Sequence, residues 1–366
     1  MRLRIGGIAT IIIIIIISII GLFVYSATRP GAVAQRALGN SSCEPTSVNV
    51  DFGPQYTGTL IDTHIHLPDD QMEWLVPFRQ PRTISDYACT FTQEGTSRVF
   101  AFFPIYPGLK NQQFAIVQAV TEKYPNLFVP FIMPPDNDDS PDGFPTVSAD
   151  VLASLLDKAP RLFAGYGEIG LYERGDHGGS KGAPALLPDS PRMQAIYPVV
   201  REHNLLVYVH LGEGQQASFE RAVAAHPDIS FIFHGDQLVQ YENGVQNLTA
   251  LDEILSRHPN VYYGVDELYG DKWLLQPEVS KEEFLAHFEN YEELLDKDVA
   301  TWKAFIERNS NQVLWGTDRG WFGGWALDPE VGVYLTRYAR AFITRLPPAV
   351  QEKFAYKNAE RLLSKR

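Results

Sequence analysis

Two histidines and an aspartate alternate at the end of an apolar run. The run reads LIDTHIHLPDD over residues 60–70, so Asp62, His64 and His66 occupy every second position. Alternate side chains of a strand point to the same face. Two imidazoles at this spacing can bind a metal ion, although the spacing also occurs by chance on exposed strands. We expect His64 and His66 to be ligands and Asp62 to hydrogen-bond beside them.

Other residues with ligand atoms end later apolar runs. His210 closes LLVYVH and His234 closes ISFIFH, at a separation of 24 residues that matches one strand-plus-helix unit. Glu168 ends GYGE and Asp318 ends LWGTD. In a parallel barrel such ends meet at one mouth. The predicted metal ligands are His64, His66, Glu168, His210, His234 and Asp318.

This set of side chains indicates hydrolytic chemistry. Imidazole nitrogen and carboxylate oxygen bind zinc, manganese or iron, so we expect one or two divalent ions, with zinc favoured. A bound ion lowers the pKa of water and supplies a nucleophile near neutral pH. Asp318 is suited to accept the proton of that water, and His234 to polarise the scissile carbonyl or orient the water. Asp318 and His234 are therefore the predicted catalytic residues.

The other five histidines lie outside this pattern. His226 and His258 are in proline junctions that enter strands, hence at the opposite end of a barrel. His177 is in a glycine-rich loop, and His203 and His287 are in helical patterns. We interpret all five as structural.

Eight short apolar runs are candidates for the strands that position the ligands. Helical patterns separate them, and a proline stops the helix just before four of the runs, as at Pro125 and Pro227. Uninterrupted apolar strands between helices indicate a parallel sheet covered on its outer face. The runs are LIDTHIHL, SRVFAFFPI, NLFVPFIMP, LFAGYGEIGL, LLVYVHL, ISFIFHG, NVYYGVDE and QVLWGTD.

This order of elements predicts an α/β fold, a closed (β/α)8 barrel of the TIM type over residues 58–366. An open doubly wound sheet is the less favoured alternative, because no glycine-rich dinucleotide fingerprint follows any strand. Two C-terminal helical stretches, near residues 328–344 and 347–363, are expected on the outside of the barrel. The long segment 268–309 should contain additional helices.

The start of the chain predicts a membrane anchor. Ile5–Thr28 carries no charge and is longer than the core of a signal peptide. We expect a transmembrane signal anchor over residues 1–28, with a cleaved signal peptide as the alternative, and a flexible linker over residues 29–57. Arg2 and Arg4 precede the segment and favour a barrel outside the cytoplasm. That barrel would be membrane-anchored, or secreted if the segment is cleaved.

Composition limits the partners. The chain has 366 residues, of which 45% are hydrophobic, enough for a large globular domain. The formal net charge of −13 opposes binding to nucleic acid, so we expect a small-molecule substrate instead. Cys43 and Cys89 either form one disulfide or remain thiols. The sequence does not indicate the oligomeric state.

The positions of the ligands resemble the amidohydrolase superfamily, which has an H-x-H on the first strand, histidines ending the fifth and sixth, and an aspartate ending the eighth. LIDTHIHL, LWGTD and the terminal YKNAERLLS look most like the amidohydrolase-related, metal-dependent hydrolases. The resemblance implies one of two arrangements. A single ion would be held by Asp318 and three of the histidines, with His234 as the catalytic imidazole. Alternatively, Glu168 would bridge two ions and His234 would bind the second.

The resemblance also implies a reaction. Hydrolysis of a carboxylic ester, lactone or amide bond of a small organic molecule is favoured. Metal-dependent decarboxylation of a small aromatic or unsaturated acid is the first alternative, a non-catalytic metal-binding barrel is the second, and Glu213 in HLGEG leaves deamination as a minor option. Arg319 and Trp321, which follow Asp318, are predicted to bind substrate, Arg319 through an acidic group. Aromatic residues such as Trp325 would form the wall of the pocket.

Overall fold

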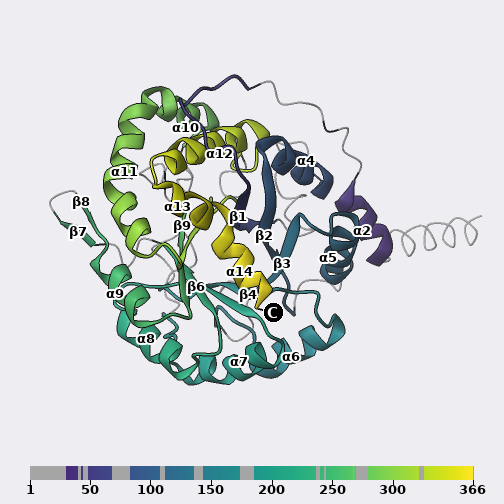
Figure 1. Cartoon of the computed structure of the whole chain (residues 1–366). Coiled ribbons are helices and arrows are strands. Elements are labelled where there is room, and N and C mark those ends of the chain that lie inside the picture. The colour runs from purple at the N-terminus through teal and green to yellow at the C-terminus, as the bar shows by residue number, and fades with distance from the viewer. Residues whose placement is uncertain are drawn as a thin grey trace, which may run out of the picture.

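Eight parallel strands form the central sheet of this computed structural model (Figure 1). They pair in the order β1-β2-β3-β4-β5-β6-β9-β10. A parallel bridge between Ile65 and Arg319 joins the two edges of the sheet and makes the barrel nearly closed. The structure describes residues 30–39, 43, 48–67, 83–107, 112–135, 143–173, 185–235, 240–242, 245–266, 268, 279–320 and 325–365.

The strands coincide with the eight predicted runs, which confirms the α/β barrel. They are short and almost entirely buried, as strands with one face toward the barrel interior and the other under helices must be. Their bounds are β1 Leu60–His66, β2 Thr96–Pro104, β3 Phe128–Met133, β4 Gly165–Gly170, β5 Leu206–His210, β6 Phe231–His234, β9 Val261–Val265 and β10 Val313–Trp315. A separate antiparallel hairpin joins β7 (Gln240–Glu242) to β8 (Val245–Asn247).

Helices surround the sheet (Figure 1). Their bounds are α4 Ile84–Glu94, α5 Gln112–Lys123, α6 Ala149–Lys158, α7 Pro191–Glu202, α8 Gln216–Ala225, α9 Thr249–Arg257, α10 Lys281–His287, η2 Phe288–Asn290, α11 Tyr291–Arg308, α12 Pro329–Thr344, α13 Pro348–Glu352, η3 Lys353–Lys357 and α14 Asn358–Ser364. Local sequence sets several of these ends. Thr83 and Asp86 form a capping box that starts α4, and Gly95 ends it with a φ of 74°.

The long segment before β10 contains two of these helices, α10 and α11, which confirms the additional helices expected there. They form a wall beside the loop that follows β10. Trp325 of that loop packs its ring 5.0 Å from the ring of Phe284 in α10. Its indole N–H donates a hydrogen bond of 3.0 Å to the carbonyl of Val279.

One C-terminal helix closes the end of the barrel at which the strands begin. Leu362 of α14 packs against the cluster of interior side chains that includes Phe100 and Leu314. The side chain of Asn358 donates a hydrogen bond of 2.8 Å to the carbonyl of Val313, the first residue of β10. Both C-terminal stretches were expected on the outer surface of the barrel. This holds for α12 but is wrong for α14, which lies across the end of the barrel (Figure 1).

The segment predicted as a flexible linker packs on the barrel. α2 (Pro30–Leu38) buries Ala34 and Leu38 next to α5. Further along, Phe52 and Tyr56 are also buried in the core. The prediction of a flexible linker over residues 29–57 is wrong for this described part, because its apolar side chains find partners on the barrel.

A disulfide between Cys43 and Cys89 attaches the same segment to α4, which confirms one of the two alternatives for the cysteines. Just before it, the backbone carbonyl of Gly39 accepts a hydrogen bond of 3.2 Å from the Lys123 ammonium group at the end of α5. Gly39 and Cys43 are thus both fixed to the helices on this side of the barrel.

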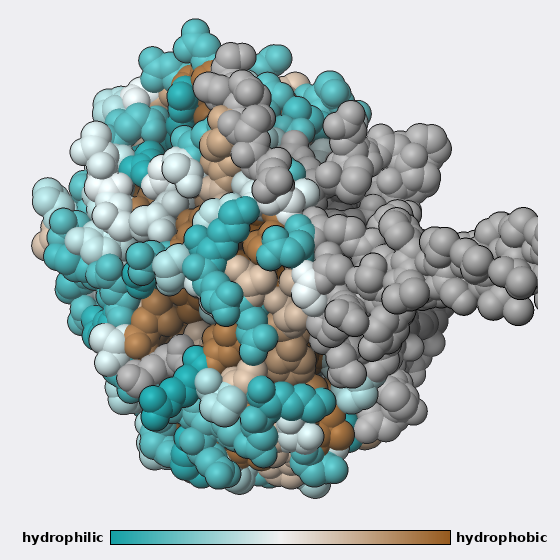
Figure 2. All heavy atoms as spheres, turned by 90° about the vertical axis from the view of Figure 1, so that its right-hand side faces the viewer, coloured by the Kyte–Doolittle hydropathy of each residue, from teal (hydrophilic) through white to brown (hydrophobic). Residues whose placement is uncertain are grey.

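The transmembrane anchor predicted over residues 1–28 lies outside the described residues. Among the described helices, none is both long enough and apolar enough to cross a membrane. Figure 2 shows the side of the molecule that carries α2 and α5, where the described surface is mostly hydrophilic, with smaller hydrophobic areas between.

Candidate metal centre

Six strands bring seven potential ligands together near their carboxyl ends. Asp318 follows β10 with a φ of 47°, in the left-handed region that aspartate tolerates better than most residues. Asp266 follows β9 and was not among the predicted ligands. We call the group the histidine cluster, and its members are His64, His66, Glu168, His210, His234, Asp266 and Asp318.

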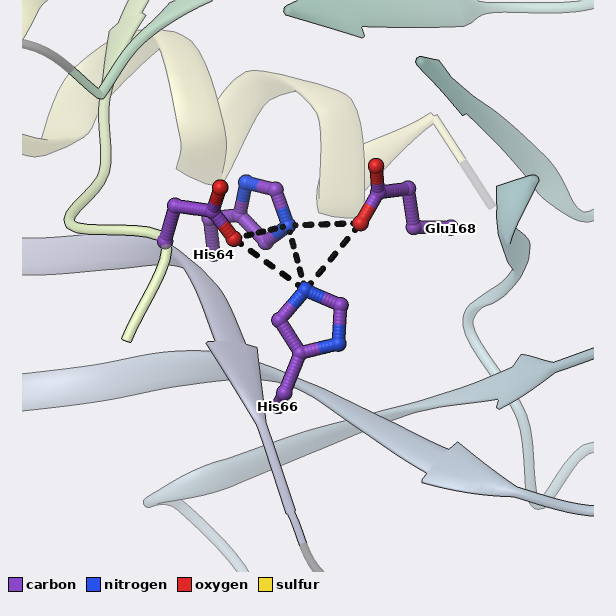
Figure 3. Close-up of side chains that lie close together, drawn as sticks. His64, His66 and Glu168 are labelled. Carbon is purple, nitrogen blue, oxygen red and sulfur yellow. Dashed lines mark hydrogen bonds and ion pairs between the residues drawn. The ribbon is translucent and has the colours of Figure 1, made fainter. Parts of the chain in front are cut away.

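Four atoms of the histidine cluster converge on one point. His64 Nε2 lies 3.0 Å from His66 Nε2, and these nitrogens lie 3.2 and 3.0 Å from the same oxygen of Glu168, Oε2. Asp318 Oδ1 is 3.1 Å from each of the two nitrogens. Figure 3 shows the side chains of His64, His66 and Glu168 pointing toward one another.

This arrangement fits a bound metal ion. Ligand atoms at the usual distances from tetrahedral zinc lie about 3.3 Å from one another. Five of the distances between these four atoms are 3.0 to 3.2 Å. Two imidazole nitrogens that face two carboxylate oxygens in a buried site require a cation or protons between them. The four atoms therefore suit a divalent ion of the predicted kind.

A second group of ligand atoms meets the other oxygen of Glu168. Oε1 lies 2.7 Å from His234 Nε2 and 3.0 Å from His210 Nδ1. Glu168 thus presents one carboxylate oxygen to each group, as a carboxylate that bridges two metal ions does. Of the two arrangements considered from the sequence, this geometry favours the one with two ion positions.

The ring nitrogens that face away from the ion positions also have partners. Asp266 Oδ2 lies 2.9 Å from His64 Nδ1 and 3.1 Å from His234 Nδ1. His66 Nδ1 lies 3.3 Å from the Met133 sulfur. An ionised carboxylate only accepts hydrogen bonds, so the two contacts with Asp266 place protons on Nδ1 and leave the Nε2 lone pairs facing the ion positions.

Burial and mutual charges act in opposite directions on the pKa values of the cluster. Burial lowers the pKa of the His64 imidazole, but Asp318 and Asp266 outweigh it and hold the pKa well above its usual value. Burial also lowers the pKa of His234, yet Glu168 contributes most to raising it to about 9. Without an ion the cluster therefore holds protons, which metal binding would displace.

The structure brings all six predicted ligands into the histidine cluster. Asp62 lies beside them instead. Its carboxylate accepts hydrogen bonds from the hydroxyl of Thr317 at 2.6 Å and from the backbone N–H of His64 at 3.0 Å. Burial raises the pKa of Asp62 to about 6, against the opposing effect of Arg319. Asp62 thus fixes the backbone of His64 and of Thr317, the residue before Asp318.

The prediction that Arg319 binds substrate does not fit its position. The guanidinium is fully buried and donates hydrogen bonds of 2.9 and 2.8 Å to the two carboxylate oxygens of Glu94 in α4. Its Nε–H donates to the hydroxyl of Thr317 at 3.1 Å. The bidentate pair occupies the donors that an acidic substrate would need. No sequence signal links Arg319 to Glu94, because 225 residues separate them.

The other expectations for the pocket have mixed outcomes. Trp321 lies outside the described residues. Trp325 is buried against α10 rather than exposed in a pocket. Glu213 is exposed and is not among the possible metal ligands of the described residues, and the minor option of deamination, in which it would be a general acid, stays a prediction.

Asp266 is the cluster member that sequence reasoning missed. It directly follows β9 in the run NVYYGVDE, whereas Asp318 lies three residues after the end of β10. Applied to the seventh run, the rule that ligands end strands would have pointed to Asp266 and its neighbour Glu267.

The histidines interpreted as structural lie elsewhere, which agrees with that interpretation where the structure describes them. His226, at the end of α8, is hydrogen-bonded through Nε2 to Gln194 at 3.0 Å. Burial and the nearby Arg201 lower its pKa. His177 lies outside the described residues.

Comparison with known proteins agrees with this architecture. A family model described as amidohydrolase matches residues 61–365, which is most of the chain. The chain belongs to the amidohydrolase family. The resemblance seen in the ligand positions is thereby confirmed. This amidohydrolase has no match among curated protein sequences.

Solved structures similar to this amidohydrolase include the probable 2-pyrone-4,6-dicarboxylic acid hydrolase of Acinetobacter baumannii with citric acid bound. It is 14% identical, with a TM-score of 0.52 over 83% of this chain and 99% of that one. An amidohydrolase of Burkholderia multivorans with bound zinc is 13% identical, with a TM-score of 0.50 over 84% of this chain and 99% of that one. At such identities the likeness shows the fold alone.

Proposed function

We propose that this amidohydrolase is a metal-dependent hydrolase that acts on a carboxylic ester, lactone or amide bond of a small organic molecule. The observation that carries the proposal is the position of Glu168, whose two oxygens each meet a separate group of ligand atoms. When bound, ions in these positions would lower the pKa of water and polarise a substrate carbonyl. Hydrolysis needs both effects.

The residues around these positions have distinct roles in the proposal. His64 and His66 would hold one ion with Asp318, and His210 and His234 the other. The Asp318 side chain is 13% exposed at the mouth, so its carboxylate can accept a proton from water that enters there. His234 Nε2 faces Glu168 Oε1 at the second position, from which it can orient water or substrate.

The chemistry of the ligands and one similar structure favour zinc as the first metal to test. Nitrogen and oxygen ligands suit zinc, manganese and iron alike. The zinc bound in the Burkholderia multivorans amidohydrolase adds support for zinc, and the hydrolase name of the Acinetobacter baumannii protein adds support for hydrolysis.

The test combines metal analysis with a substrate panel. The purified full chain should contain one or two divalent ions and should hydrolyse members of a panel of esters, lactones and amides. Activity should disappear with a chelator and return with zinc or manganese. Release of carbon dioxide from aromatic or unsaturated acids, without hydrolysis, would replace the proposal by decarboxylation. Bound metal without turnover of any panel member would favour a non-catalytic barrel.

We also propose that the barrel lies outside the cytoplasm and is attached to the membrane by residues 1–28. The disulfide between Cys43 and Cys89 supports an oxidising compartment. Mass spectrometry of the mature protein from a membrane fraction should find the N-terminal peptide. If the mature chain begins after residue 28 and is soluble, the anchor is a cleaved signal peptide.

A further inference from the structure

We propose that Asp266 is a positioning residue that orients one ligand imidazole of each ion position, and that it thereby couples the binding of the two ions. The inference rests on the metal site of the proposed function. It concerns a residue outside the predicted ligand set, placed behind the imidazoles rather than at the ions.

A single oxygen of Asp266 makes both contacts. Oδ2 lies 2.9 Å from His64 Nδ1 and 3.1 Å from His234 Nδ1. His64 presents its other nitrogen to the group with His66 and Asp318, whereas His234 presents its other nitrogen to Glu168 Oε1. One carboxylate oxygen therefore lies behind a ligand of each group.

The consequence follows from the properties of imidazole. A neutral ring carries one proton, and a hydrogen bond from Nδ1–H to a carboxylate fixes that proton and the orientation of the ring. Both Nε2 lone pairs then face the ion positions. A carboxylate behind a ligand imidazole also makes the ring a stronger ligand, and removal of such a partner typically weakens metal binding about 10-fold to 100-fold.

The surroundings of Asp266 indicate that the protein makes room for this carboxylate. A Cβ atom on Gly316 would lie 2.3 Å from Asp266 Oδ1, and one on Gly264 would lie 3.4 Å from both carboxylate oxygens. The residue is only 5% exposed. Within the described structure, Oδ1 is buried without a hydrogen-bond partner.

These facts separate Asp266 from a carboxylate with a purely structural role. No arginine or lysine is paired with it among the ion pairs of the described residues, where its partners are His64 and His234. A buried carboxylate whose contacts are imidazoles is stabilised only while these rings remain in place. The link between the two ion positions thus passes through Glu168 on the ion side and through Asp266 on the far side.

The test compares Asp266→Asn and Asp266→Ala with the unaltered full chain. Zinc would be removed by dialysis against a chelator and restored in a competition titration with a fluorescent zinc chelator, which yields the dissociation constant of each ion. We expect both ions to bind about 10-fold to 100-fold more weakly in the Ala variant, and less so in the Asn variant. ¹H–¹⁵N NMR of the zinc-loaded proteins with labelled histidine should show the Nδ1–H protons of His64 and His234 at the low-field shifts of a hydrogen bond to a carboxylate, and these two signals should lose that shift in Asp266→Ala.

Asp298→Asn is the matched control. Asp298 is also a buried aspartate, but it accepts a hydrogen bond of 2.7 Å from the Tyr338 hydroxyl and lies outside the histidine cluster. This variant should lose stability while both dissociation constants stay within about 2-fold of the unaltered values. An equal loss of zinc affinity in the control would show that the effect is one of general destabilisation and would overturn the inference.

The remaining outcomes also decide the matter. Unchanged zinc affinity in Asp266→Ala would overturn the inference but leave the proposed hydrolase standing. Weakening of only one ion would overturn the coupling. Failure of the unaltered chain to bind any divalent ion would overturn both this inference and the proposed function. Zinc binding without hydrolysis in the unaltered chain would overturn the function alone.

Discussion

Two buried groups of charged side chains meet at β1, and they are neutralised in different ways. We call Asp62, Glu94, Thr317 and Arg319 the arginine cluster. There the chain provides its own cation, because Arg319 donates to Glu94 and Thr317, and Thr317 donates to Asp62. The histidine cluster, two residues further along β1, has three carboxylates and four imidazoles but no arginine or lysine.

The difference teaches what a ligand site requires. In the arginine cluster the guanidinium pairs with Glu94, and Asp62 accepts hydrogen bonds from Thr317 and the backbone of His64, so the chain supplies every partner itself. The imidazoles of the histidine cluster can balance its carboxylates only by taking up protons or by sharing an external cation. The first cluster is therefore expected to determine stability, and the second to determine metal binding and activity. The following predictions test this division, from the largest expected effect to the smallest.

Asp318→Asn should remove most of the activity and leave the fold intact. The amide keeps the size of the side chain but cannot accept a proton, and loss of a general base typically costs about 10²-fold to 10⁴-fold in rate. Turnover of the best panel substrate should fall by this amount, while circular dichroism and the urea midpoint of the metal-free variant stay close to those of the metal-free unaltered protein. Full turnover in the variant would contradict the role assigned to Asp318.

Glu94→Gln should have the opposite pattern. Removal of one partner from a fully buried ion pair typically costs about 3–5 kcal/mol, and Arg319 would keep only the more distant carboxylate of Asp62, at 3.8 Å. The free energy of unfolding in urea should fall by this amount, since the side chains of Glu94 and Arg319 are both 0% exposed. The number of bound ions should be unchanged in the folded variant.

The double variant Glu94→Leu and Arg319→Met is the control for this prediction. It removes both charges of the pair, and the buried carboxyl of Asp62 can take up a proton once Arg319 is gone, so at about pH 5 the double variant should be less destabilised than Glu94→Gln. If the single variant instead kept its stability but lost bound metal, the division of roles between the two clusters would be wrong.

The same two clusters show how far the sequence could predict the structure. Ligands at strand ends could be predicted, because in a parallel barrel the position of a residue along its own strand determines whether it reaches the mouth. That rule found His210 and His234 and would have found Asp266. The partner of Arg319 could not be predicted, because the position of Glu94 depends on how α4 packs against the barrel.

The linker illustrates a related limit. Residues 29–57 are rich in Gly, Pro, Ser and Asn and have no apolar periodicity, which is typical of a flexible segment, yet Ala34, Leu38 and Phe52 are buried in the core. Composition reports the preference of an isolated segment, whereas burial depends on apolar surface that other elements provide. The disulfide at Cys43 is likewise a property of the folded pair, and the sequence left it open.

Metal should stabilise the protein through the histidine cluster alone. A ligand that binds only the folded state at 100 times its dissociation constant adds about 2.7 kcal/mol to the free energy of unfolding. We expect zinc to produce a gain of this size in the unaltered protein and in Glu94→Gln. His64→Ala should show a much smaller gain, and an undiminished gain in that variant would place the stabilising ion outside the histidine cluster.

The smallest expected effect is a dependence of stability on pH that differs with and without metal. The pKa of His234 is raised to about 9, and those of His64 and His66 are also raised. Groups with a raised folded-state pKa stabilise the protein fully below their unfolded value of about 6.5, and this contribution is lost as the pH rises. The metal-free protein should therefore lose stability between about pH 6.5 and 9, and metal affinity should increase over the same range as protons compete less.

The pKa of Asp62 is raised to about 6, below most of this window, so the arginine cluster contributes little there. Urea titrations at several pH values, with and without saturating zinc, check this prediction. A loss of stability that is equally steep with zinc bound would show that the titrating groups are not the residues that hold the ion.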